Sequence, residues 1–101
     1  MTVEYIRYNI APEKKNAFLT AYEKASEQLN ASEFCLGYEL TQCEEEPTSF
    51  ILRIEWTSTE DHLNGFRKSS DFAVFLKHVR PFFNDIMEMN HYQLTSVLKN
   101  R

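Results

Sequence analysis

The three histidines of the chain are the side chains best suited to proton transfer or metal binding. His62, His78 and His91 are far apart, and none has a histidine or cysteine partner at the short spacing typical of a metal site. A histidine titrates near neutral pH, so it can accept the proton of a phenol. We take His62 as the candidate general base, and the sequence predicts neither a metal site nor a cofactor.

His62 lies four residues before Phe66, and residues at this spacing share one face of a helix. The alternative is an exposed histidine in the acidic stretch around Asp61. His78 is expected at the edge of a buried helical face. His91 opens the predicted last strand. Alternation places Tyr92 and Leu94 on the inner face and His91 on the other face, so a surface or interface role is predicted for His91.

Four aromatic residues are candidates for the wall of a ligand pocket. Trp56 ends the apolar face of a predicted strand, and Phe66 and Phe75 fall on the helical segments that follow. Tyr38 lies on the preceding strand and carries a hydroxyl group that needs a partner when buried. The alternative for each is an ordinary core position, and the two roles are compatible because core residues line such pockets.

Hydrophobic periodicity predicts the elements that must position these residues. The pattern gives strands at residues 3–10, 35–43, 50–56 and 91–98, and helices at residues 12–30, 58–67 and from 69 or 70 onward. Ser58 and Ser69 suit the first positions of their helices, and Pro81 is expected to kink or end the last one. The order βαββαβ predicts an α+β, ferredoxin-like fold, in which two helices cover one face of a four-stranded antiparallel sheet.

Composition narrows the classes of protein and partner. With 101 residues, 43% of them hydrophobic, the chain is expected to form a single domain over residues 1–101. The net charge of -4 weighs against nucleic-acid binding, which needs a basic surface. The sequence has no apolar run of membrane-spanning length and no visible signal peptide, so no membrane association is predicted.

Two further expectations concern the two cysteines and the face of the sheet away from the helices. Cys35 and Cys43 on one strand would be roughly 26 Å apart at ~3.3 Å per residue, too far for a disulfide, so free thiols and a cytoplasmic location are predicted. Arg7, Arg53 and Glu55 share the face away from the helices. This face is either solvated or, as we favour, the sheet-to-sheet interface of a homodimer.

Several short segments occur in the same order as similar segments in one protein superfamily. They are Tyr38-Glu39-Leu40, residues 53–60 from Arg53 to Glu60, Ser69-Ser70-Asp71-Phe72 with Phe75, and His91-Tyr92. Along nearly its whole length the chain resembles the antibiotic biosynthesis monooxygenase superfamily. The resemblance implies a ferredoxin-like subunit, a dimeric α/β barrel, and a ligand pocket between the sheet and the helices of each subunit.

The same resemblance implies three possible functions. The favoured one is a cofactor-independent monooxygenase acting on an aromatic or quinol-like small molecule, with His62 as catalytic residue and Tyr38, Trp56, Phe66 and Phe75 as substrate-binding residues. The alternative is a non-catalytic ligand-binding or dimeric scaffold domain, because Phe66 occupies the position where many relatives carry histidine. Haem degradation is disfavoured, because Leu76 occupies the position of the haem-ligating histidine.

Overall fold

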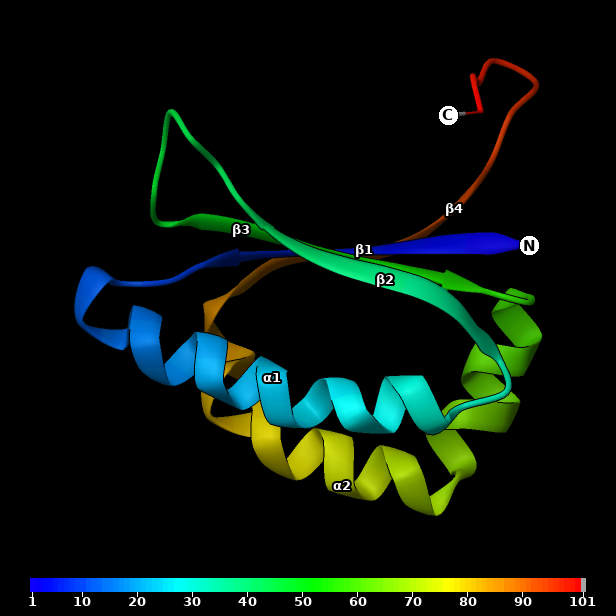
Figure 1. The fold of residues 1–101 in the computed structure, drawn as a ribbon, viewed down its shortest axis with the longest axis horizontal. Helices are drawn as coiled ribbons and strands as arrows, with labels where there is room; N and C mark the ends of the chain where they lie inside the picture. Colours follow the sequence, from blue (N-terminus) through cyan, green and yellow to red (C-terminus); the bar gives the residue numbers. More distant parts are fainter. Residues whose placement is uncertain (101) are drawn as a thin grey trace.

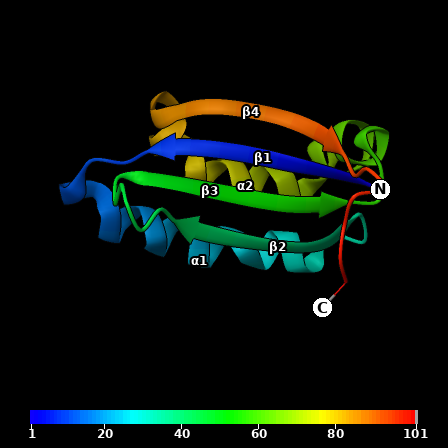
Figure 2. The ribbon, with the colours of Figure 1, turned by 90° about the horizontal axis from the view of Figure 1, so that it is seen from above.

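The computed structural model describes residues 1–100, which form a four-stranded antiparallel sheet with two helices on one face (Figure 1). The elements are β1 (Thr2–Asn9), α1 (Lys15–Ala31), β2 (Cys35–Gln42), β3 (Ser49–Trp56), α2 (Ser70–Val79) and β4 (Ile86–Gln93). The strands lie in the order β2-β3-β1-β4, so β1 and β3 are central (Figure 2). The predicted ferredoxin-like βαββαβ fold is therefore confirmed.

Helix α1 forms because its apolar residues fall on one stripe. Phe18, Tyr22, Ala25 and Leu29 recur at spacings of four, three and four, and all four are buried against the sheet. Pro12 lies in a single 3-10 turn just before the helix, where a missing N–H is tolerated. The predicted helix over residues 12–30 agrees with this arrangement to within one residue.

Two short turns, η2 (Asp61–Gly65) and η3 (Phe66–Lys68), connect β3 to α2. Ser58 begins this segment, and its Oγ accepts the backbone N–H of Asp61 at 2.9 Å. Ser69 begins α2 in the same way, accepting the N–H of Phe72 at 3.3 Å. Both predicted helix starts are correct, although η2 is a wider π-type turn, a form that often marks functional sites.

The prediction of the last strand is wrong in its position and in its inner face. β4 spans Ile86–Gln93 rather than residues 91–98, and Met87 is an extra residue between the pairs Tyr8–Ile86 and Arg7–Glu88. This bulge changes which residues face the helices. His91, paired with Glu4 of β1, faces inward, whereas Tyr92 packs its ring against Tyr5 on the outer face.

A second bulge alters the start of β2. Cys35 pairs with Trp56 and Gly37 pairs with Glu55, so Leu36 has no partner in the ladder. Leu36, expected on the inner face, is 54% exposed, while Tyr38 and Leu40 pack against the core as predicted.

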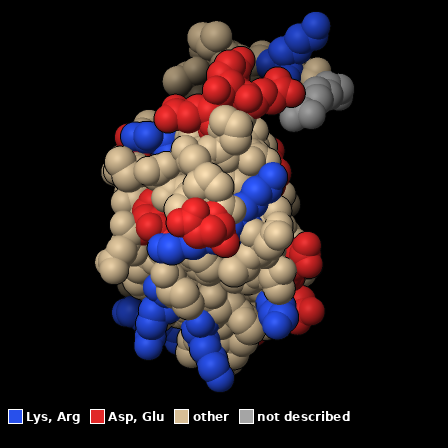
Figure 3. Space-filling model, turned by 90° about the vertical axis from the view of Figure 1, so that its left-hand side faces the viewer, with Lys and Arg blue, Asp and Glu red and all other residues tan. Residues whose placement is uncertain are grey.

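The outer face of the sheet carries no helix (Figure 1). Charged side chains on it form ion pairs. Arg53 forms ion pairs with Glu55 at 2.9 Å and with Glu39 at 3.6 Å, and its Nε donates to the hydroxyl of Tyr5. Figure 3 shows acidic and basic side chains interspersed on one end of the molecule, without a continuous basic surface there. No helix within residues 1–100 is long and apolar enough to cross a bilayer.

Candidate functional site

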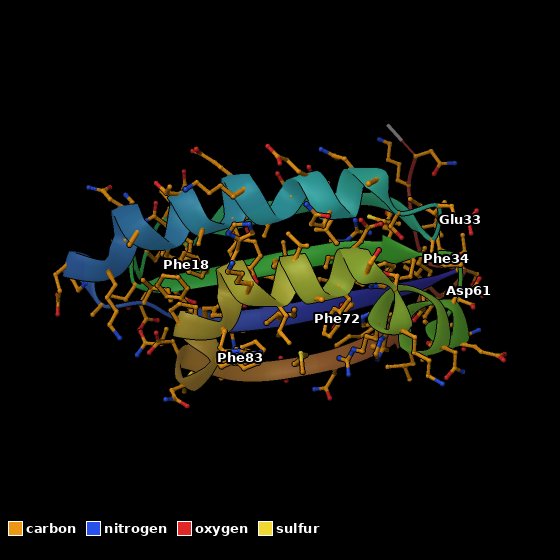
Figure 4. All side chains as sticks on the ribbon, turned by 90° about the horizontal axis from the view of Figure 1, so that it is seen from below. Phe18, Glu33, Phe34, Asp61, Phe72 and Phe83 are labelled. Atoms are coloured by element: carbon orange, nitrogen blue, oxygen red, sulfur yellow. The ribbon has the colours of Figure 1, made fainter. Side chains whose placement is uncertain are left out.

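A cavity of about 520 Å³ lies between the sheet and α2. Its wall is mainly aromatic and aliphatic, and Phe72 and Phe83 flank it on the helical side (Figure 4). The polar or ionisable residues that line it are Glu4, Tyr8, Tyr22, His62 and Arg67. This volume and lining are typical of a small-molecule site, which is mostly apolar with a few polar groups.

The structure brings four of the five predicted site residues together around this cavity. Trp56 is fully buried, and its indole stacks on the imidazole of His62 with ring centres 4.3 Å apart and planes 10° apart. Phe66 lies 5.0 Å from Trp56 and 5.7 Å from Phe75, measured between ring centres. All four residues line the cavity.

Tyr38 is the exception. It lies on the edge strand β2, where its hydroxyl donates to Asn30 Oδ1 of α1 at 2.9 Å. Strands β1, β3 and β4 and both helices contribute residues to the cavity wall, but β2 contributes none, so Tyr38 does not line it. Strand alternation correctly places Tyr38 on the inner face, but it does not tell which helix covers that part of the sheet.

Glu4, His62 and His91 form a polar cluster at one end of the cavity. Glu4 Oε1 accepts the indole N–H of Trp56 at 3.1 Å and lies 3.7 Å from His62 Nε2. The other imidazole nitrogen, His62 Nδ1, forms a hydrogen bond of 2.7 Å with His91 Nε2. Glu4 and His62 are only 1% and 3% exposed, so these contacts replace water.

Burial shifts the pKa values of this cluster in opposite directions. Desolvation raises the pKa of Glu4, while the Trp56 hydrogen bond and the charge of Arg67 act against that shift. Desolvation lowers the pKa of His62 to about 3, helped by the nearby Arg67 and His91. The pKa of His91 is lowered as well, by burial and by Arg67. His62 is therefore neutral at pH 7, so its contact with Glu4 is not an ion pair.

Two phenols and one guanidinium group complete the polar lining. The buried hydroxyls of Tyr8 and Tyr22 are hydrogen-bonded to each other, and burial raises the pKa of Tyr8 to about 12 and that of Tyr22 well above its usual value. Both are therefore protonated donors at pH 7. Arg67 Nε is buried and has no hydrogen-bond partner among residues 1–100. These groups suit a ligand that carries an oxygen acceptor.

The predicted sites omit Glu4, His91 and Arg67. Glu4 alternates with Ile6 and Tyr8, so strand parity alone already places it on the inner face. The prediction places His91 on the opposite face, because the predicted strand begins at residue 91 instead of Ile86. No clear sequence signal marks the bulge at Met87. We find no sequence signal for Arg67.

The sequence model of the antibiotic biosynthesis monooxygenase family matches residues 1–78 of the chain. The chain belongs to this family. The match covers the cavity-lining residues of β1, β3 and the η2–η3 turns, but it stops before β4. His91 therefore lies outside the part of the chain that the family model describes.

The chain is also similar to a bacterial protein in sequence and to solved structures in fold. The uncharacterized protein YczJ of Bacillus subtilis (strain 168) is 28% identical over 76 residues, which cover 75% of this chain and 80% of YczJ. A crystal structure of a candidate antibiotic biosynthesis monooxygenase of Bordetella bronchiseptica has a TM-score of 0.80 at 23% identity, covering 93% of this chain and 96% of that one. The structure of Rv0793 from Mycobacterium tuberculosis has a TM-score of 0.71 at 14% identity, covering 99% and 98%. At these identities the two structures establish the shared fold.

Proposed function

We propose that this family member is a monooxygenase that oxidises an aromatic or quinol-like small molecule bound in the cavity. The observation that carries the proposal is the division of the cavity into an aromatic wall and one polar end. Trp56, Phe66 and Phe75 would pack against the rings of the ligand, and Glu4 and His62 would meet its hydroxyl group.

The first chemical step would be removal of a proton from the ligand. His62 is the base that the sequence predicts, but a pKa near 3 makes its imidazole a weak acceptor by itself. The raised pKa of Glu4 makes its carboxylate a stronger acceptor, and it lies 3.7 Å from His62 Nε2. We therefore propose that Glu4 and His62 act as a pair, with Glu4 receiving the proton and His62 orienting the ligand hydroxyl.

The deprotonated ligand would then supply the electrons for dioxygen reduction. In a balanced turnover, one oxygen atom of dioxygen forms a carbonyl group at an activated ring carbon. The hydrogen of that carbon and the hydroxyl proton removed in the first step leave with the second oxygen atom as water, so the ligand becomes a quinone. Arg67 and the hydroxyls of Tyr8 and Tyr22 would stabilise negative charge on the ligand oxygen.

The alternative is a binding domain without catalysis. It is favoured by Phe66, whose ring contacts Trp56 and Phe75 and can neither donate nor accept a proton. In this case the cavity would bind the same class of ligand, but the chain would not oxidise it.

An oxygen electrode with a panel of quinols and hydroxylated polycyclic aromatics tests the proposal. We expect consumption with at least one compound, strongly reduced in Glu4→Gln and His62→Ala and unchanged in His78→Ala, whose histidine does not line the cavity. Quenching of the single tryptophan, Trp56, measures binding independently. Binding without oxygen consumption across the panel would favour the non-catalytic alternative.

A further inference from the structure

We propose that Glu4, His62 and His91 form a binding site for one divalent first-row transition-metal ion at the polar end of the cavity. One carboxylate oxygen and one nitrogen of each imidazole all lie within 4.8 Å of one another. Two imidazoles and one carboxylate are a ligand set used by zinc and by non-haem iron in proteins. The three residues come from β1, η2 and β4, so only the folded chain brings them together.

A metal ion would draw the three ligand atoms closer together than the limit of 4.8 Å within which they lie. Ligand atoms about 2.1 Å from an ion lie roughly 3.0–3.4 Å from one another in octahedral or tetrahedral geometry. Glu4 Oε1 is 3.7 Å from His62 Nε2, whereas His91 Nε2 is 2.7 Å from Nδ1, the other nitrogen of the same imidazole. Since one imidazole gives an ion only one nitrogen, metal binding would require side-chain rotations that bring Glu4 and His91 toward the same nitrogen of His62. The hydrogen bond between the imidazoles would be replaced by two metal–nitrogen bonds.

The residues around the cluster already restrict its side chains. Glu4 and His91 are paired in the register of β1 and β4, which fixes the separation of their backbones. The indole N–H of Trp56 holds one oxygen of Glu4, and the same indole stacks on the imidazole of His62. Such outer contacts orient metal ligands and raise metal affinity.

Charge and space in the cavity define what else the ion would bind. Three protein ligands leave coordination positions open, and both Glu4 and His62 line the cavity. Arg67 lines it too, and no ion pair joins it to Glu4 within the described residues. Its positive charge opposes the metal ion directly but would favour an anionic oxygen bound to that ion. Arg67→Gln should therefore increase affinity for the metal alone.

Equilibrium dialysis of EDTA-treated protein against Zn²⁺, and titration with Co²⁺ followed by absorption, test the site without any substrate. We expect one equivalent of metal per chain. Loss of a ligand in Glu4→Gln or His91→Ala should weaken binding by more than about 100-fold, beyond the usual effect of an outer contact. His78→Ala is the matched control, because it removes the one histidine outside the cluster and should leave binding unchanged.

The cobalt spectrum also separates this site from metal binding by the cysteines. A thiolate-to-cobalt absorption band would assign the metal to Cys35 or Cys43 and overturn the proposal, as would unchanged affinity in both ligand variants or no saturable binding. If Glu4→Gln does not fold, His91→Ala, at a half-buried position, decides the question. The site does not depend on the proposed oxygenation, since dialysis contains no substrate, and oxygen consumption in EDTA tests the reaction separately.

Discussion

Trp56 and Phe66 occupy neighbouring positions but differ in what surrounds them. Trp56 has no exposed surface, and its N–H satisfies the buried carboxylate of Glu4. Trp56→Ala should lower the free energy of unfolding by roughly 3–5 kcal/mol, measured by urea denaturation followed by circular dichroism. Phe66→Ala should cost less, because its ring is smaller and, unlike the indole of Trp56, makes no hydrogen bond to the buried Glu4. An equal or larger loss for Phe66 would show that the Trp56–Glu4 contact does not stabilise the chain.

His62 makes stability depend on pH. Its pKa is about 3 in the folded chain, against an ordinary value of 6.5, so acid protonates the unfolded state first. The stability contributed by this group is complete above pH 6.5 and is lost as the pH falls toward 3. At about pH 4.5 the loss should be roughly 2–3 kcal/mol relative to neutral pH.

Comparison with His62→Gln isolates this contribution, because the variant cannot be protonated. The raised pKa of Glu4 acts in the opposite direction, since it favours the folded state at low pH and loses that effect as the pH rises. The parent chain should therefore lose more stability on acidification than His62→Gln in parallel urea titrations. If the free energy of unfolding falls equally steeply with decreasing pH in the two proteins, His62 is accessible to protons in the folded state.

At the scale of elements, the turn between β3 and α2 depends on a glycine for steric reasons. Gly65 has a φ of -96°, which any residue can adopt, but an added Cβ would lie 2.5 Å from Cε2 of Phe34. Gly65→Ala should therefore destabilise the chain by about 1–3 kcal/mol through overpacking. Thermal denaturation of Gly65→Ala, Phe34→Leu and the double variant checks this. The double variant should recover part of the loss, and purely additive effects would contradict the steric explanation.

The elements also divide into those that the sequence predicts well and those that it does not. Ser58 and Ser69 begin their helices where predicted, because capping depends on residues three positions apart. The predicted position of β4 is too late, because Met87 interrupts the alternation on which strand assignment depends. The cluster of Glu4, His62 and His91 could not be predicted by spacing, since it requires the pairing of β1 with β4 as well as the η2 turn.

At the scale of the whole molecule, the outer face of the sheet leads us to propose a homodimer. Arg53 is held between Glu39 and Glu55 on this face, with Tyr5 and Tyr92 packed edge to face beside it. Sedimentation at micromolar concentration should give twice the 12.0 kDa mass of the chain. Arg53→Glu should shift the equilibrium toward monomer, because it places three carboxylates together, whereas Lys24→Glu on the exposed side of α1 should not. A folded parent protein that sediments as a monomer would contradict the proposal.

The central position of β1 has a consequence for the order in which the molecule can assemble. β1 precedes the other strands of this sheet in the sequence, yet it pairs on one side with β3 and on the other with β4, which follows them all. Contacts between residues so distant in sequence form slowly, because a long loop must be closed. Glu4 therefore remains without His91 until β4 has been synthesised. A nascent chain that ends before β4 can fold its helices locally, but it exposes an edge of β1 and has no complete polar cluster.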